Sequence, residues 1–295
     1  MMYKNLGRTG DKIPAMGMGS WELAGGNDDG VEALKHGLEL GIKFIDTAEI
    51  YGTEETVGKA LKGQKDVFVA TKVWPNHFKH DDVIRACNSS LAKLGISTID
   101  LYQLHWPNYN VPISETMSAM EELQKQGKIR HIGVSNFSAK EVEVAQSVMK
   151  NSEIVSNQIE YSVVVREPEM DFVEYSRKNG TTVIAYSPLA HGVLYDNRNG
   201  KLMELLSEIG KKYGKTATQV ALNWLISKEN VVTIPKANSA RHVDENFGAV
   251  GFKLKGDDVS RIDAQARAFE QRSLAASFKE RNRSQFGDSK TGLKV

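Results

Sequence analysis

Eight short apolar segments, separated almost everywhere by helical patterns, constrain the fold of this chain more than any other feature. The segments are rich in β-branched residues, which is typical of strands buried on both faces. They cover residues 16–19, 42–46, 67–72, 99–105, 129–134, 154–158, 181–186 and 231–234. Strands that alternate with helices pair in parallel through right-handed crossovers, and eight such units close most naturally into a barrel. The sequence therefore predicts an α/β fold, a (β/α)8 TIM barrel.

The segments between the predicted strands carry the signals of amphipathic helices. Two of them place apolar residues at steps of three and four, which puts those residues on one helical face. The residues are Ile84, Cys87, Leu91 and Leu94 in one gap, and Ile113, Met117, Met120 and Leu123 in the next. Gly95 supplies a stop after the first helix. Ser138 with Glu141, and Thr216 with Gln219, have the spacing of capping boxes at helix starts.

The two ends of the chain lie outside the alternation. Tyr3 and Leu6 belong to an apolar-polar alternation that is followed by Gly7 and Gly10, and this pattern favours a short β-hairpin that plugs the bottom of the barrel. Residues 270–295 hold few apolar anchors and are expected to form an irregular C-terminal tail. Nothing in the tail suggests a second domain, so residues 1–295 are predicted to form a single domain.

An open, doubly wound sheet is the competing architecture for a chain of alternating strands and helices. A dinucleotide-binding sheet of that kind normally carries a G-x-G-x-x-G fingerprint in its first turn, and no strand candidate here is followed by one. The barrel is therefore favoured.

Charge and cysteine content limit the partners of the protein. The 38 Lys and Arg residues nearly balance the 37 Asp and Glu residues, so no electrostatic reason exists to expect nucleic acid or an anionic membrane as a partner. No apolar run approaches the ~20 residues of a membrane span. Cys87 is the only cysteine, and the first twenty residues contain scattered charges instead of a signal-peptide core. These features predict a cytoplasmic monomer or homo-oligomer whose partner is a small molecule.

Polar residues close or directly follow seven of the predicted strands. They are Asp46, Lys72, His105, Asn136, Gln158, Ser187 and Lys236. Any one of them taken alone is most simply read as a strand cap. The C-terminal ends of barrel strands, however, meet on one face, which is where the active sites of such barrels lie. The sequence therefore predicts that these seven side chains converge on a site.

Seven motifs resemble those of the aldo-keto reductase family and occur in the order found in that family. They are GIKFIDTAEIYG (41–52), VATKVW (69–74), LYQLHWP (101–107), GVSNF (133–137), NQIEY (157–161), AYSPLA (185–190) and IPKA (234–237). The resemblance covers roughly residues 6–246. It implies an NADPH-preferring oxidoreductase of the alcohol dehydrogenase (NADP+) type, which reduces aldehydes, ketones or sugars to alcohols by hydride transfer without a metal.

The resemblance also implies a catalytic tetrad of Asp46, Tyr51, Lys72 and His105. In that reading Tyr51 donates a proton to the carbonyl oxygen while hydride arrives at the carbon. A phenol has a pKa near ~10, and the ammonium group of Lys72 is expected to lower it. Asp46 is expected to form a buried ion pair with Lys72, and His105 to hydrogen-bond the carbonyl oxygen.

The implied cofactor is NADP(H), with NAD(H) as an alternative. Tyr186 resembles the residue that stacks on the nicotinamide, residues 187–194 resemble a loop that folds over the pyrophosphate, and Lys236 resembles a phosphate ligand beside a helix N-terminus. The full cofactor set implied by the resemblance is Gly19, Ser20, Trp21, Asp46, Ser135, Asn136, Gln158, Tyr186, Ser187, Leu189, Gly192, Ile234, Lys236, Asn238, His242, Glu245 and Asn246. Ser135, Asn136 and Gln158 are expected to bind the carboxamide, and Glu245 and Asn246 the adenine.

His242 departs from the pattern of several family members, which carry an arginine for the 2′-phosphate at this position. A histidine is mostly neutral at pH 7, so the sequence predicts a moderate preference for NADPH over NADH. The substrate is expected to lie among residues that are mostly aromatic, namely Trp21, Tyr51, Trp74, His105 and Trp106.

Two other functions remain open at this point. Lys72 at a strand end is also compatible with a barrel aldolase that forms a Schiff base. Some proteins similar to this chain act mainly as channel-associated subunits, so a non-catalytic, cofactor-binding regulatory subunit is the second alternative.

Overall fold

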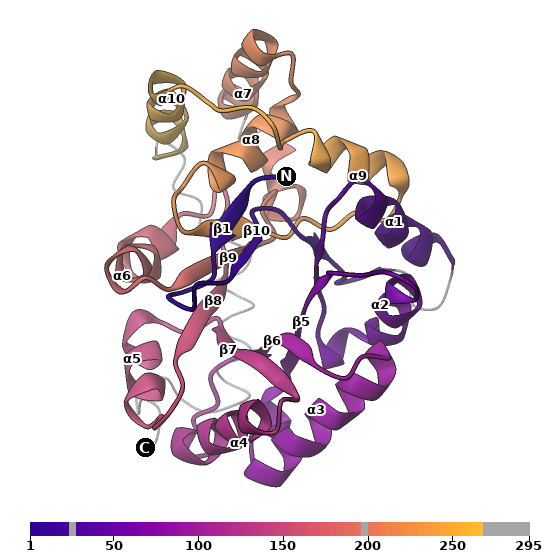
Figure 1. The fold of residues 1–295 in the computed structure, drawn as a ribbon. Helices are drawn as coiled ribbons and strands as arrows, with labels where there is room; N and C mark the ends of the chain where they lie inside the picture. Colours follow the sequence, from indigo (N-terminus) through magenta and orange to yellow (C-terminus); the bar gives the residue numbers. More distant parts are fainter. Residues whose placement is uncertain (24–27, 196–199, 268–295) are drawn as a thin grey trace.

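The structure is a computed structural model that describes residues 1–23, 28–195 and 200–267. Eight parallel strands form one sheet in which each strand pairs with its neighbours in chain order (Figure 1). They are β3 (Met18–Gly19), β4 (Phe44–Asp46), β5 (Phe68–Val73), β6 (Ile99–Leu104), β7 (Ile129–Ser135), β8 (Ile154–Glu160), β9 (Thr182–Tyr186) and β10 (Val231–Thr233). Each of the eight predicted segments overlaps one of these strands, and β5, β7 and β8 extend one or two residues beyond the predicted ends.

The sheet curls until its first and last strands meet. Met16 pairs with Thr233 and Gly19 pairs with Lys236, both in the parallel sense, and these bridges join the two ends of the sheet. A Cβ atom on Gly19 would lie 2.8 Å from the carbonyl oxygen of Ile234, so only glycine allows this close approach. The predicted (β/α)8 barrel is confirmed.

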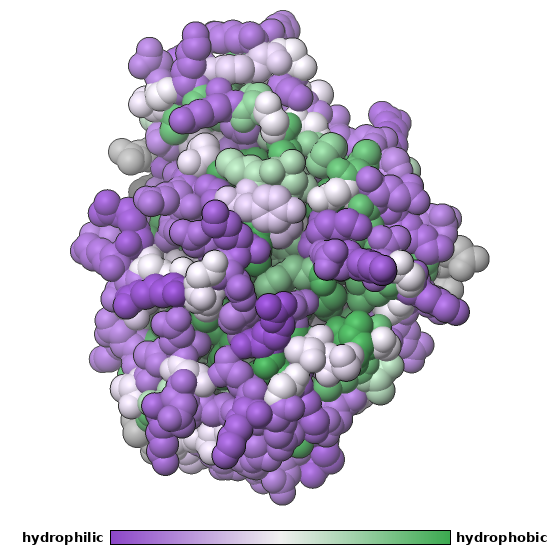
Figure 2. All heavy atoms as spheres, in the orientation of Figure 1, coloured by the Kyte–Doolittle hydropathy of each residue, from purple (hydrophilic) through white to green (hydrophobic). Residues whose placement is uncertain are grey.

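Helices surround the barrel on its outside (Figure 1). They are α1 (Asp28–Glu39), α2 (Glu54–Leu61), α3 (His80–Leu94), α4 (Ile113–Lys125), α5 (Ala139–Ser147), α6 (Phe172–Asn179), α7 (Gly200–Tyr213), α8 (Ala217–Ile226), α9 (Ala240–Phe247) and α10 (Gly256–Arg267). Short 3-10 helices are η1 (Glu49–Tyr51), η2 (Pro75–His77), η3 (Glu167–Met170) and η4 (Ala190–Tyr195). Figure 2 shows that hydrophilic residues cover the outer helices, while hydrophobic ones gather toward the middle of this face. None of the described helices is long and apolar enough to cross a membrane.

Local sequence signals explain where several helices begin and end. Gly95 ends α3 with φ = 66°, in the left-handed region that glycine adopts without strain. The predicted capping boxes form at the starts of α5 and α8: Ser138 accepts the backbone N–H of Glu141, and Thr216 accepts that of Gln219.

An N-terminal hairpin of β1 (Tyr3–Asn5) and β2 (Lys12–Pro14) lies against the barrel, as predicted. The backbone N–H of Gly7 donates to Oγ1 of Thr182, the first residue of β9, over 2.8 Å, so the hairpin contacts the N-terminal end of the strands. Leu6 and Ile13 are fully buried within the apolar cluster that fills the barrel interior. Each such side chain contributes roughly 1.5–3 kcal/mol through burial. The predicted tail at 270–295 lies outside the described residues.

The barrel interior changes from apolar to polar along the strands. Phe44, Ala70 and Leu101 belong to the apolar interior cluster. Side chains of a strand alternate, so the next inward positions are two residues further on, at Asp46, Lys72 and Gln103. Lys72 and Gln103 are register partners on adjacent strands. This alternation brings a polar layer to the C-terminal end of the barrel.

Candidate active site

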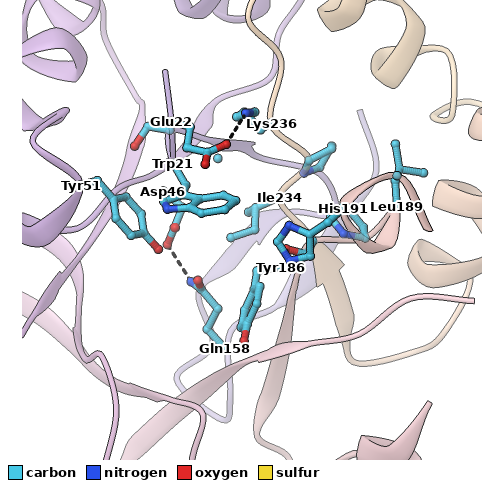
Figure 3. Close-up of a pocket in the computed structure, with 16 residues that line it drawn as sticks. Trp21, Glu22, Asp46, Tyr51, Gln158, Tyr186, Leu189, His191, Ile234 and Lys236 are labelled. Atoms are coloured by element: carbon cyan, nitrogen blue, oxygen red, sulfur yellow. Dashed lines mark hydrogen bonds and ion pairs between the residues drawn. The ribbon is translucent and has the colours of Figure 1, made fainter. Parts of the chain in front are cut away.

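A cavity of about 480 Å³ opens at the C-terminal ends of the strands (Figure 3). Most of its lining was predicted from the sequence, and these residues are Gly19, Ser20, Trp21, Asp46, Tyr51, Gln158, Tyr186, Ser187, Leu189, Gly192, Ile234 and Lys236. Glu22, Pro188, His191 and Pro235 also line it and were not singled out by sequence reasoning. Chain segments from 19 to 236 therefore converge on one cavity. Of the seven predicted strand-end residues, four line it (Asp46, Gln158, Ser187 and Lys236) and three do not (Lys72, His105 and Asn136).

Asp46 and Lys72 form a buried ion pair beneath this cavity. Nζ of Lys72 lies 2.5 Å from Oδ1 of Asp46 and also donates to the carbonyl oxygen of Thr47 over 2.8 Å. Lys72 is 0% exposed and Asp46 is 2% exposed. Burial lowers the pKa of Lys72, and the carboxylate of Asp46 opposes that effect. The pair has the arrangement expected from the sequence.

Tyr51, on η1, places its phenol beside this pair. Nζ of Lys72 lies 5.0 Å from the centroid of the Tyr51 ring, and Oη of Tyr51 lies 3.4 Å from Nε2 of His105. Burial raises the pKa of Tyr51 well above the usual phenol value, and the carboxylate of Asp46 raises it further. The expected lowering by Lys72 is not found, because Asp46 offsets the charge of Lys72 and leaves the desolvation of the phenolate as the larger effect. Tyr51 therefore holds its proton at neutral pH.

His105 follows β6 and is 6% exposed. Burial and the charge of Lys72 hold its pKa well below the usual histidine value, so the imidazole is neutral. Its Nδ1 atom is buried and has no hydrogen-bond partner among the described residues, while Nε2 faces Tyr51. The half-buried ring of Trp74 packs edge-on against His105 with the centroids 5.2 Å apart. Nε2 is therefore the ring nitrogen that can hydrogen-bond a ligand beside Tyr51.

Two glutamine side chains hold the second oxygen of Asp46. Nε2 of Gln158 donates to Oδ2 over 2.7 Å, and Nε2 of Gln103 donates to the same oxygen over 3.4 Å. Gln103 is fully buried and was missed by sequence reasoning. The signal available for it was a polar residue in a largely apolar strand, at the inward position two residues before His105.

Ser135 and Asn136 lie behind the cavity wall. The hydroxyl of Ser135 donates to the backbone oxygen of Gln158 over 2.9 Å, and the hydroxyl of Tyr186 donates to Oδ1 of Asn136 over 2.8 Å. Nδ2 of Asn136 donates to the carbonyl oxygen of His105 over 3.1 Å. Both residues are buried and neither lines the cavity. In this structure they hold Gln158, Tyr186 and His105 in position.

The loop after β9 covers one side of the cavity in a strained conformation. Ser187, Ala190 and His191 have φ values of 46°, 52° and 51°, which non-glycine residues adopt rarely. Nε2 of His191 lies 2.8 Å from Oγ of Ser187, and its ring packs edge-on against Trp21 with the centroids 5.5 Å apart. Burial lowers the pKa of His191. Trp21 and His191 therefore contact each other, and both line the cavity (Figure 3).

Lys236 brings a positive charge to the cavity lining. Its Nζ lies 3.2 Å from Oε2 of Glu22 and 5.8 Å from the centroid of the Trp21 ring (Figure 3). Glu22 has φ = 54°, again in the left-handed region. The side chains of Lys236 and Glu22 are 33% and 59% exposed, so solvent reaches this ion pair.

Besides Ser135 and Asn136, four more of the predicted cofactor residues lie outside this cavity, namely Asn238, His242, Glu245 and Asn246. Asn238 lines a separate cavity of about 440 Å³ beside α1. His242 is exposed on α9, and its backbone N–H donates to Oγ of Ser239. Asn246 donates to the carbonyl oxygen of Lys236 over 3.4 Å, and Glu245 accepts the hydroxyl of Thr216 over 2.5 Å.

The predicted substrate residues divide into three groups. Trp21 is 42% exposed and lines the cavity with Tyr51. Trp74 and His105 pack against each other, and neither lines the cavity. Trp106 is only 3% exposed and lies in the interior. An aromatic residue at a strand end can face inward or into the packed layer behind the strand, and the sequence does not distinguish the two.

Comparison with known proteins gives a consistent set of relatives. A family model described as the aldo/keto reductase family matches residues 15–267. The chain is 36% identical over 272 residues to the methylglyoxal reductase YeaE of Escherichia coli (strain K12). This alignment covers 89% of this chain and 95% of that protein.

Among solved structures, the fold is similar to a thermostable aldo-keto reductase crystallised with the inhibitor epalrestat. That match has a TM-score of 0.84 and 43% identity, and it covers 90% of this chain and 100% of the other. An aldo-keto reductase from Klebsiella pneumoniae in complex with NADPH gives a TM-score of 0.82 and 32% identity, covering 92% and 98% of the two chains.

Proposed function

The chain belongs to the aldo/keto reductase family, and from this we propose that it reduces a carbonyl compound to an alcohol with NADPH as hydride donor. The observation that carries the proposal is the position of Tyr51. Its phenol stands between the buried Asp46–Lys72 pair and the neutral ring of His105, at one end of a cavity whose other end holds Lys236. The cavity volume of about 480 Å³ lies within the range of roughly 300–1,000 Å³ that is typical of small-molecule sites.

Tyr51 is proposed as the proton donor. The raised pKa keeps the phenol protonated at neutral pH, so the proton is present when the carbonyl oxygen gains negative charge. The reduced nicotinamide would supply the hydride to the carbonyl carbon. The phenolate that remains would be stabilised by Lys72, whose Nζ lies 5.0 Å from the ring centroid, and would recover its proton from solvent.

His105 and Asp46 are proposed to support this step. Nε2 of the neutral His105 ring would donate a hydrogen bond to the same carbonyl oxygen, which orients it toward Tyr51. Asp46 would keep Lys72 in place and charged, since an unpaired ammonium group at this depth would be costly.

The residues of the cavity fit a nicotinamide dinucleotide. Tyr186 presents an aromatic ring for the nicotinamide, and Gln158 presents an amide for its carboxamide. Gly192 allows close approach of the backbone to the pyrophosphate, and Lys236 offers a cation for a phosphate group. We propose NADPH over NADH because of Lys236 and because a related structure binds NADPH. The preference is proposed to be moderate, because His242 on α9 stands where several family members carry an arginine.

We propose small aldehydes and ketones with partly apolar substituents as substrates. Trp21 and Tyr51 give the cavity aromatic walls, and a relative at 36% identity is a methylglyoxal reductase. Methylglyoxal is therefore the first substrate to assay. We also propose that residues 1–295 form one domain, since the family model spans the chain from 15 to 267.

The aldolase alternative has little support from the geometry. Nζ of Lys72 is buried, bonds Asp46 and Thr47, and does not line the cavity, so it is not placed to attack a carbonyl group. Borohydride in the presence of substrate should therefore trap no adduct on Lys72.

The proposed function is tested by following NADPH oxidation with methylglyoxal, simple aldehydes, ketones and sugars, and then with NADH in place of NADPH. We expect turnover with small aldehydes and faster turnover with NADPH. If no carbonyl compound is reduced while NADPH still binds, the protein is a cofactor-binding regulatory subunit and the proposal is wrong.

A further inference from the structure

Glu22 brings a carboxylate to the part of the cavity where an anion would bind. Its Oε2 atom lies 3.2 Å from Nζ of Lys236, and both side chains line the cavity (Figure 3). The contact joins residues 214 positions apart in the sequence, and no motif pointed to Glu22.

The charges around this contact nearly cancel. Among the described residues that line the cavity, the carboxylates are Glu22 and Asp46 and the ammonium group is Lys236. Asp46 is neutralised by Lys72. The nearby ring of His191 stays neutral, because burial lowers its pKa. Lys236 is thus the one cation that the described cavity lining offers to a phosphate, and Glu22 occupies it.

We propose that Glu22 is a specificity-determining residue that competes with the cofactor's 2′-phosphate for Lys236 and so limits the preference for NADPH over NADH. The inference rests on the proposed function. A phosphate group that approaches Lys236 meets the like charge of Glu22, and the ion pair must open before the phosphate can bind. NADH lacks this phosphate and makes no such demand.

The geometry allows the pair to open and close. The side chains of Glu22 and Lys236 are 59% and 33% exposed, and ion pairs with this much exposure stabilise a fold only slightly. Water can therefore replace either partner at small cost. Glu22 stays close to the cavity, since it directly follows Trp21, whose ring lies 5.8 Å from Nζ of Lys236.

The test is the affinity of the full-length protein for NADP+ and NAD+ in the Glu22→Gln variant, measured by isothermal titration calorimetry. Glutamine keeps the size of the side chain and removes its charge. We expect the Kd for NADP+ to fall about tenfold and the Kd for NAD+ to change less than about threefold, as loss of one like-charge contact near the surface predicts.

Two further variants separate this effect from a general change in charge. Glu143 is an exposed carboxylate on α5, so Glu143→Gln changes the net charge equally and should leave both Kd values unchanged. In a Lys236→Met background, Glu22→Gln should improve NADP+ binding by less than about threefold, because the competition requires Lys236.

Equal Kd values for NADP+ in the wild type and in Glu22→Gln would overturn the inference and leave the proposed function standing. An equal gain for NAD+ and NADP+ would overturn it as well, since Glu22 would then not discriminate the 2′-phosphate. Failure of both proteins to bind either dinucleotide would overturn the inference together with the proposed cofactor.

Discussion

Nε2 of Gln158 donates a hydrogen bond to Oδ2 of Asp46 over 2.7 Å, and this contact couples the proposed cofactor site to the buried ion pair. Gln158 resembles a residue that binds the nicotinamide carboxamide, and its Nε2 is committed to Asp46. Its Oε1 is the atom left to accept a hydrogen bond from the carboxamide NH2 group. The same side chain would then orient both the nicotinamide and the carboxylate that supports Lys72.

Replacing Gln158 with leucine should weaken the binding of NADP+ by about 2- to 13-fold, which is the value of one hydrogen bond of 0.5–1.5 kcal/mol. Binding of 2′,5′-ADP, which lacks the nicotinamide, should not change. Calorimetric titration of the two ligands against wild type and variant measures the difference. Equal losses for both ligands would mean that Gln158 does not contact the nicotinamide end.

Replacing Tyr51 with phenylalanine should abolish most carbonyl reduction while NADP+ still binds, since only a hydroxyl group is removed. A general acid contributes roughly 100- to 10,000-fold to the rate. The kcat with methylglyoxal and the Kd for NADP+ check this prediction. Activity above a tenth of the wild-type value would show that another group delivers the proton.

Asp46→Ala should destabilise the protein more than Lys72→Met. The first change leaves the ammonium group of Lys72 buried with only the carbonyl oxygen of Thr47, whereas the second leaves Asp46 with two amide donors, Gln158 and Gln103. Breaking a buried pair costs about 3–5 kcal/mol, and loss of the proton from Lys72, whose pKa is lowered, limits the cost. Thermal melting of both variants tests the order. If the melting temperature of Asp46→Ala equals or exceeds that of Lys72→Met, leaving Lys72 unpaired is not the costlier change and the prediction is wrong.

The free energy of unfolding should fall as the pH drops below about 6.5, in part because of His105. Its pKa in the folded protein lies well below 6.5, so in this range the unfolded chain binds a proton that the folded protein does not. Stability rises with pH wherever the unfolded state binds more protons. The contribution of His105 is therefore complete above pH 6.5 and is lost progressively toward its lower folded pKa.

A His105→Gln variant should show a smaller loss of stability between pH 7 and pH 5, by up to about 1.4 kcal/mol per pH unit. Urea denaturation of wild type and variant at several pH values provides the comparison. Parallel curves for the two proteins would mean that the pKa of His105 is the same in the folded and unfolded states, so that burial does not lower it.

The sequence by itself determined the barrel and most of the cavity wall. Strand and helix patterns are local, so β-branched runs, apolar stripes and capping boxes such as Ser138 with Glu141 locate the elements without knowledge of distant contacts. Once the strands are parallel, their C-terminal ends share one face, and Asp46, Gln158 and Lys236 must then approach one another.

The tertiary structure alone decided how these residues are partnered. Glu22 meets Lys236 across 214 positions, and Ser135 and Asn136 support the wall instead of lining it, since side-chain directions at strand ends depend on barrel closure. The pKa of Tyr51 rises instead of falling because burial and Asp46 together outweigh Lys72. A pKa of this kind depends on how deeply the group is buried and on its distances to other charges, and periodicity along the chain does not encode either quantity.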